Sequence, residues 1–126
     1  RDKLTTPNIK ITGWVDNKTA LNYLADTDIF ILTSLWEGLP MALLEAMYMK
    51  KICIVSDVVG NRDVINNDRN GYIVSSVSDY VKTINDIMTE KKIDQIIINA
   101  KENVINHYNS KIMANQYEQI YKKHLV

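Results

Sequence analysis

Two glutamates are the residues whose type and spacing point to chemistry. Glu37 precedes Gly38 and Pro40, and Glu45 follows eight positions later as the only charge in the run Met41–Met49. Pro40 suits the first turn of a helix, where its missing N–H is not needed. The run that follows is apolar on nearly every face, which predicts a buried helix. An unpaired carboxylate in such a helix is destabilising, so Glu45 needs a partner.

Hydroxyl donors or a cation could supply that partner. A vicinal diol such as a ribose 2′,3′ pair offers two O–H groups to one carboxylate. Glu37 lies on the loop that leads into the helix, so Glu37 is expected at the mouth of a site and Glu45 one to two turns inside it. Gly38 permits close backbone approach, and the N–H groups of the helix start favour an anion. The arrangement suits a diphosphate between a ribose and a sugar. Alternatively, Glu37 interacts with the helix dipole and Glu45 pairs with a lysine or arginine.

Composition excludes several classes of function. Fifteen basic and fifteen acidic residues balance, so no net field favours a nucleic acid. The single Cys53 lies in an apolar run and predicts a core thiol rather than a disulfide or a cysteine metal site. His107 and His124 have no partners at ligand spacing, so no metal is expected. A polar start and the lack of a long apolar run predict a cytoplasmic protein.

Short apolar runs alternate with helical patterns, which predicts an α/β fold with a Rossmann-like parallel sheet. A helical tail, without an internal repeat or linker, predicts a single domain over residues 1–126. The expected strands are Ile9–Thr12, Asp28–Thr33, Ile52–Ser56 and Tyr72–Val74, the second of them covered on both faces. The expected helices are Thr19–Leu24 capped by Asp16 or Asn17, Met41–Met49, a piece at Asp63–Ile65 after a Gly60–Asn61 turn, Ser78–Met88, Ile93–Asn106 and Ser110–His124.

The stretch Ser34–Met47 resembles the signature of the retaining GT-B glycosyltransferases called family 4, which has two glutamates separated by seven residues. Further segments resemble the same family in order along the chain: Ile9–Trp14, the loop Val58–Ile65, Asn70–Tyr72 and Tyr117–Tyr121. This resemblance implies the C-terminal, donor-binding domain of such an enzyme.

The resemblance also implies roles. Glu37 would be the catalytic contact to the donor sugar, and Glu45 would hold the ribose hydroxyls. The backbone of Gly38, Leu39 and Pro40 would face the diphosphate or sugar, and the segment 13–15 (Gly13, Trp14, Val15) would line the base pocket. The family needs no metal or cofactor, because the helix dipole and basic side chains stabilise the leaving diphosphate. Arg62 could reach a phosphate, although an arginine in a polar turn is more often a surface residue.

Two departures from the family pattern stand out. Val59 and Asp63 replace a glycine and a glutamate in the loop. The opening strand with its Gly-Arg-x-x-x-Lys-Gly segment is not recognisable, which implies an incomplete GT-B C-terminal domain and a missing N-terminal acceptor domain. The gap lies beside the Ile29 strand, so either the first strand shifts onto that edge or two copies associate there.

The expected function is transfer of a sugar from a nucleoside diphosphate to an acceptor sugar or lipid in bacterial polysaccharide or glycolipid synthesis. The isolated chain is expected to be inactive, and the whole enzyme to be peripheral at the inner membrane face through its missing domain. The alternatives are a non-catalytic nucleotide-binding or scaffold module, and a sugar-nucleotide epimerase of the same fold. Trp14 and Trp36 flank the expected pocket, and Tyr108, Tyr117 and Tyr121 are expected to pack the last helix against the body.

Overall fold

Three parallel strands form the centre of the computed structural model, which describes residues 6–89 and 92–125. The strands lie in the order β1-β2-β3, and Ile29 of β1 pairs with Ile52 of β2 while Ile54 of β2 pairs with Tyr72 of β3. The elements are α1 (Asn17–Ala25), β1 (Ile29–Leu32), α2 (Met41–Tyr48), β2 (Ile52–Ser56), α3 (Val59–Val64), β3 (Tyr72–Val74), α4 (Val77–Ile87), α5 (Ile93–His107) and α6 (Ser110–His124).

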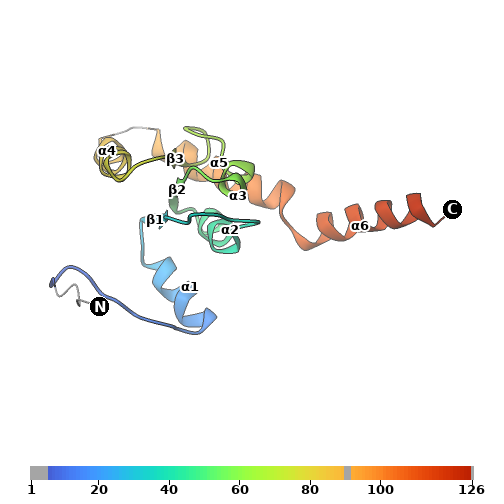
Figure 1. The fold of residues 1–126 in the computed structure, drawn as a ribbon, viewed down its shortest axis with the longest axis horizontal. Helices are drawn as coiled ribbons and strands as arrows, with labels where there is room; N and C mark the ends of the chain where they lie inside the picture. Colours follow the sequence, from blue (N-terminus) through green and yellow to red (C-terminus); the bar gives the residue numbers. More distant parts are fainter. Residues whose placement is uncertain (1–5, 90–91, 126) are drawn as a thin grey trace.

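Helices cover the two faces of the sheet unequally. On one face, Cys53 and Val55 of β2 pack with the buried side chains of α2 and with Ala100 and Val104 of α5. On the other face, Ile54 packs mainly against α4, through Ile87. Figure 1 shows α2 and α4 on opposite sides of the strands. The alternation of strand side chains between two apolar layers is the reason for the nearly continuous apolar runs in the sequence.

β1 is less covered than its sequence predicts. Ile31 is 44% exposed, and the side chains of Ile29, Phe30 and Leu32 are only partly buried. Among the described residues, β1 pairs with β2 alone, so its other edge has no strand beside it. The expectation of a central strand buried on both faces is therefore wrong for β1.

The first expected strand, Ile9–Thr12, is not a strand. Ile9 and Ile11 are exposed, and the segment that leads into α1 lies apart from the strands (Figure 1). An extended segment without a hydrogen-bonding neighbour forms no sheet. The prediction that this strand shifts onto the edge of β1 is therefore wrong, whereas association of two copies at that edge stays a prediction.

Two other local predictions are corrected. Gly60 and Asn61 do not form a turn but lie buried inside α3, where the absence of a side chain at Gly60 permits close contact with a neighbouring loop. The N-cap of α4 is Ser76 rather than Ser78, because the Ser76 hydroxyl accepts a hydrogen bond from the N–H of Asp79. The cap of α1 is Asp16, one of the two residues expected there.

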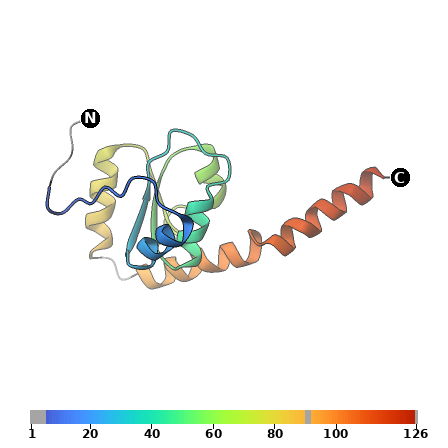
Figure 2. The ribbon, with the colours of Figure 1, turned by 90° about the horizontal axis from the view of Figure 1, so that it is seen from below.

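The helical tail forms as predicted, but α6 leaves the body of the molecule. None of its side chains is buried, and it projects beyond α5 (Figure 2). Tyr108 packs on the core and donates a hydrogen bond to the carbonyl of Asp63, whereas Tyr117 and Tyr121 stay exposed and contact each other. Packing of the last two tyrosines against the body is therefore wrong. Among the described residues, no helix is long and apolar enough to cross a membrane.

Candidate functional site

The loop between β1 and α2 holds Glu37 at the carboxyl end of the sheet. Glu37 is half-buried, and its Oε1 accepts a hydrogen bond of 2.5 Å from the hydroxyl of Ser34. Ser34 follows β1 by two residues, so the strand determines where this hydroxyl lies. Carboxyl ends of parallel strands meet at one edge of a sheet, which is where α/β folds place their ligands. Glu37 thus lies on the loop at the mouth of α2, as its place in the sequence predicts.

Glu45 lies in the middle of α2, but the helix is not buried all round. Leu43, Ala46 and Met47 are inaccessible, whereas Met41 and Tyr48 are more than half exposed and Glu45 is half-buried. The prediction of a helix buried on every face is therefore wrong, because β1 and α1 leave one side open. The burial cost of the Glu45 carboxylate is correspondingly smaller than the sequence suggests.

No cation neutralises either glutamate within residues 6–89 and 92–125. The ion pairs of this part of the chain join Arg62 to Asp57 and Lys122 to Glu118, and all four side chains are exposed. Pairing of Glu45 with a lysine or arginine is thus not found, and Arg62 is a surface residue. The Glu45 carboxylate remains available to a ligand.

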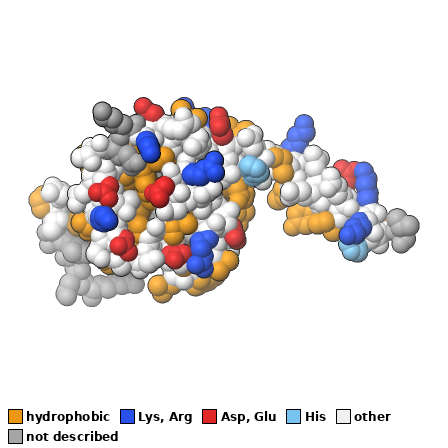
Figure 3. Space-filling view, turned by 90° about the horizontal axis from the view of Figure 1, so that it is seen from above, with side chains coloured by type: hydrophobic (Ala, Val, Ile, Leu, Met, Phe, Trp, Pro, Cys, Tyr) orange, Lys and Arg blue, Asp and Glu red, His pale blue; other side chains and the backbone are white. Residues whose placement is uncertain are grey.

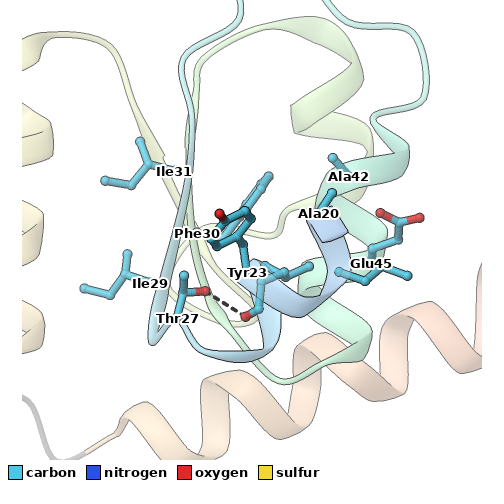
Figure 4. Close-up of a pocket in the computed structure, with 10 residues that line it drawn as sticks. Ala20, Tyr23, Thr27, Ile29, Phe30, Ile31, Ala42 and Glu45 are labelled. Carbon is cyan, nitrogen blue, oxygen red and sulfur yellow. Dashed lines mark hydrogen bonds between the residues drawn. The ribbon is translucent and has the colours of Figure 1, made fainter. Parts of the chain in front are cut away.

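A cavity of about 280 Å³ adjoins Glu45 between α1, β1 and α2. Glu45 and Ala42 of α2 lie beside Ala20 of α1, while Phe30 and Tyr23 line the remaining wall (Figure 4). The lining is almost wholly apolar apart from Glu45 and the hydroxyls of Tyr23 and Thr27. An apolar pocket with a single carboxylate suits a group that presents hydroxyls on an otherwise weakly polar frame.

The loop before α2 is open at Gly38, whereas the N-cap Pro40 is buried. Pro40 is the N-cap without a side-chain hydrogen bond, and its carbonyl accepts from the N–H groups of Leu43 and Leu44. Gly38 is exposed, and open space surrounds the position of a Cβ. Leu39 lines an apolar hollow of about 520 Å³ between α2 and the junction of α5 with α6. The loop and helix start can therefore be approached from solvent.

The segment proposed for the base does not form a closed wall. Gly13 has a φ of +66°, Trp14 is 92% exposed and Val15 is half-buried just before α1. The positive φ explains the glycine, because residues with a Cβ rarely adopt that conformation. Trp36 on the Glu37 loop is also highly exposed, at 82%.

Three further residues, missed by the sequence reasoning, connect to Glu37. The amide of buried Asn61 donates to the carbonyl and hydroxyl of Ser56, and the Ser56 hydroxyl donates to the carbonyl of Ser34. Ser34 and Ser56 line a crevice of about 440 Å³ at the carboxyl ends of the strands, as does Tyr80. The signal in the sequence was the place of both serines at the ends of predicted strands, with Ser34 directly after Asp28–Thr33 and Ser56 as the last residue of Ile52–Ser56.

The remaining titratable groups fit structural roles. Burial raises the pKa of Cys53 to about 12, in keeping with the predicted core thiol. Burial also raises the pKa of Tyr80 and of Tyr108. Within the described residues no three His, Cys, Asp or Glu side chains are grouped so that they could hold a metal ion.

Comparison with known proteins assigns the family. Residues 2–104 match the family described as "Glycosyl transferases group 1". The chain belongs to this family. The expected relationship to GT-B glycosyltransferases, read from the segment Ser34–Met47, is thereby confirmed.

Several curated relatives of this group 1 chain are named as sugar transferases. It is 28% identical over 113 residues to the UDP-Gal:alpha-D-GlcNAc-diphosphoundecaprenol alpha-1,3-galactosyltransferase of Escherichia coli. This match covers 88% of this chain and 29% of that protein. It is 26% identical over 131 residues to the poly(ribitol-phosphate) alpha-N-acetylglucosaminyltransferase of Staphylococcus aureus, covering 95% of this chain and 25% of that one. The chain therefore spans less than a third of the length of these relatives.

Solved structures share the fold of the group 1 chain. Sucrose-phosphate synthase from Thermosynechococcus elongatus superposes with a TM-score of 0.78 at 21% identity, over 90% of this chain and 29% of that one. The Anabaena protein Alr3699/HepE, solved in complex with UDP, superposes with a TM-score of 0.75 at 18% identity. The match covers 80% of this chain and 29% of that one. The C-terminal domain of a group 1 protein from Francisella tularensis superposes with a TM-score of 0.69 at 23% identity. The match covers 79% of this chain and 53% of that one. The predicted α/β class, with a Rossmann-like parallel sheet, flanking helices and a helical tail, is confirmed.

Proposed function

We propose that this chain supplies the nucleotide-sugar donor site of a glycosyltransferase that acts in polysaccharide or glycolipid biosynthesis. The observation that carries the proposal is the pair Glu37 and Glu45, neither of which is neutralised by a cation of the described residues. They lie at the mouth and in the middle of one helix at the carboxyl end of a parallel sheet. A scaffold would not require unpaired carboxylates in these two positions.

Each part of the donor has a group to meet it. Glu45 accepts hydrogen bonds from two hydroxyls of the ribose. The backbone of Gly38, Leu39 and Pro40 faces the diphosphate at the positive end of the α2 dipole. Glu37 contacts the donor sugar near the carbon that is transferred. The segment Gly13, Trp14 and Val15 meets the base. UDP is the first nucleotide to test, because a structure with this fold was solved with UDP.

Transfer is proposed to be electrostatic. The leaving diphosphate gains negative charge as its bond to the sugar breaks, and the N–H groups at the start of α2 stabilise that charge. The proposed reaction retains the anomeric configuration and uses neither metal nor cofactor. The chain spans less than a third of its relatives, so the 126 residues alone are proposed not to transfer sugar. The acceptor, a sugar or lipid, meets the whole enzyme through another domain.

The place of action follows from the acceptors of the relatives. The Escherichia coli relative is named for a diphosphoundecaprenol-linked acceptor, which is a lipid. A transferase for a lipid acceptor would meet it at a membrane surface. We therefore propose peripheral attachment to the inner face of the membrane.

A titration with UDP, GDP and ADP, with and without magnesium, tests the donor site. We expect metal-independent binding of one nucleotide, and calorimetry measures its affinity. The ribose contact is tested by a cycle that combines Glu45→Gln with the 2′,3′-dideoxy form of that nucleotide, which lacks both hydroxyls. A hydrogen bond to a charged group contributes about 1.5–3 kcal/mol, so Glu45→Gln should weaken the ribonucleotide about tenfold or more. The same change should hardly affect the 2′,3′-dideoxy form.

Glu102→Gln, an exposed glutamate on α5, is the matched control and should leave both affinities unchanged. Equal losses for the two nucleotides in Glu45→Gln would show that Glu45 does not contact the ribose. Failure of all three nucleotides to bind would refute the donor site itself.

A further inference from the structure

A chain of hydrogen bonds runs from the buried interior to the carboxylate of Glu37. The amide nitrogen of Asn61 donates to the Ser56 carbonyl at 2.9 Å and to the Ser56 hydroxyl at 3.3 Å. The Ser56 hydroxyl donates to the Ser34 carbonyl at 2.6 Å, and the Ser34 hydroxyl donates to Glu37 Oε1 at 2.5 Å. The chain thereby links α3, the end of β2 and the loop after β1.

The same loop is held by a second, independent contact. A Cβ built on Gly60 of α3 would lie 2.1 Å from the carbonyl oxygen of Gly38 and 2.6 Å from that of Glu37. Backbone therefore touches backbone at this point, and only glycine fits there. The loop that carries Glu37 is therefore linked to α3 twice, by this backbone contact and by the hydrogen-bond chain.

Burial of Asn61 is destabilising, because one polar atom of its side chain has no hydrogen-bond partner. The side chain is 0% exposed, and its Oδ1 has no hydrogen-bond partner among the described residues. An apolar side chain of similar size would leave no acceptor unpaired. What the asparagine adds is its N–H donors, and both bonds that they make are directed to Ser56.

We propose that Ser34, Ser56 and Asn61 are positioning residues that fix the Glu37 carboxylate toward the donor sugar. The inference rests on the proposed function, in which Glu37 contacts that sugar. Ser34 occupies one carboxylate oxygen, Oε1, and directs the group, while Oε2 is left to receive a sugar hydroxyl. A carboxylate held in one orientation before the ligand arrives needs less ordering on binding, which strengthens the contact to the sugar but not the contact to the nucleotide.

The test compares a nucleotide with its sugar forms. Calorimetry on the protein and on Ser34→Ala measures affinities for UDP, UDP-galactose and UDP-N-acetylglucosamine. We expect Ser34→Ala to weaken the preferred sugar nucleotide about tenfold relative to UDP, and Ser34→Thr, which keeps the hydroxyl, to restore it. Ser78→Ala, which removes an exposed hydroxyl at the start of α4, should change neither affinity.

Glu37→Gln separates the two hypotheses. A loss of sugar-nucleotide affinity in Glu37→Gln but not in Ser34→Ala would overturn the positioning role and leave the proposed function standing. Unchanged affinity in Glu37→Gln would overturn the role of Glu37 and the inference with it. An equal loss for UDP and its sugar forms in Ser34→Ala would show a general structural defect and would also overturn the inference.

A measurement without ligand tests the hydrogen-bond chain directly. Amide hydrogen exchange of Arg62 and Ile65 in α3, whose N–H groups donate to the carbonyls of Val58 and Asn61, should accelerate about tenfold or more in Ser56→Ala and return to the original rate in Ser56→Thr, while the amides of β2 keep their protection. Unchanged exchange in α3, or equal acceleration in β2, would overturn the proposal whether or not the protein binds a nucleotide.

Discussion

Replacing Gly60 with alanine should force apart two pieces of backbone that touch. The new methyl group would lie 2.1 Å from the carbonyl oxygen of Gly38 and within 3 Å of two backbone atoms of Glu37. A carbon–oxygen contact needs at least about 3 Å, so α3 or the loop must move by about 1 Å. No flexible side chain lies between them to absorb the movement, since all three near atoms belong to the backbone.

Two opposing effects set the size of the change. Alanine is favoured over glycine inside a helix by about 1 kcal/mol. Overpacking a tight contact is destabilising by about 1–3 kcal/mol, and a backbone contact belongs at the upper end of that range. The net expectation is a decrease of about 1–2 kcal/mol in the free energy of unfolding.

The single, buried Cys53 provides the assay. Pulses of a maleimide label it only in unfolded molecules, so labelling against urea concentration gives the unfolding curve. Gly38→Ala is the matched control, because open space surrounds its Cβ position, and it should change the free energy of unfolding by less than about 0.5 kcal/mol. A Gly60→Ala protein as stable as the original, or more stable, would refute the close contact between α3 and the Glu37 loop.

Two predictions concern pH. Burial raises the pKa of Cys53 from 9.0 to about 12, so between these values the unfolded thiol ionises while the folded thiol stays neutral; stability that is complete below pH 9 is lost as pH rises, by about 1.4 kcal/mol at pH 10. Urea unfolding followed by circular dichroism between pH 8 and 10 should show this decrease, and a matching decrease in Cys53→Ala would contradict it. Hydrogen bonds from Thr19, first from its backbone N–H, lower the pKa of Asp16, so the stability contributed by this cap is present at neutral pH and is lost as pH falls through the acidic range. Asp16→Asn, which keeps an acceptor, should reduce the acid dependence of Tm, whereas Asp16→Ala should lower Tm at neutral pH; equal Tm values for all three proteins at pH 7 would disprove the cap.

The sequence predicted the elements whose patterns are local. β2, the α2 helix and the α1 cap each depend on neighbouring residues, so their apolar runs and capping residues were sufficient. The prediction of the first strand was wrong because a strand needs a hydrogen-bonded neighbour. Ile9–Thr12 has a strand-like pattern, yet among the described residues no strand pairs with it. The incomplete cover of β1 has the same origin, since an apolar run does not reveal how many layers surround it.

The candidate site divides along the same line. The places of Glu37 on a loop and of Glu45 on the following helix could be predicted, because both depend on Pro40 and on a short spacing. The hydrogen-bond chain through Ser56 and Asn61 could not, because it joins residues more than twenty positions apart through the sheet register. Asn61 was expected in a turn, where asparagine is common, and only the fold shows it buried.

An exposed apolar surface lies along α6, where Met113, Tyr117, Ile120 and Tyr121 are more than half exposed. Figure 3 shows hydrophobic side chains gathered on one side of this projecting helix. A helix of this length that buries nothing is only marginally stable on its own, so its ends should exchange amide hydrogens faster than those of α5.

The exposure of both tryptophans determines which changes the tryptophan fluorescence of this protein can detect. Trp14 and Trp36 are 92% and 82% exposed, so their indole rings already meet water in the folded state. Their emission should therefore change little when the chain unfolds. A molecule that settles over the Glu37 loop would instead move Trp36 into a drier environment and shift its emission to shorter wavelength. Tryptophan fluorescence should therefore be insensitive to unfolding but sensitive to ligand binding at the proposed donor site.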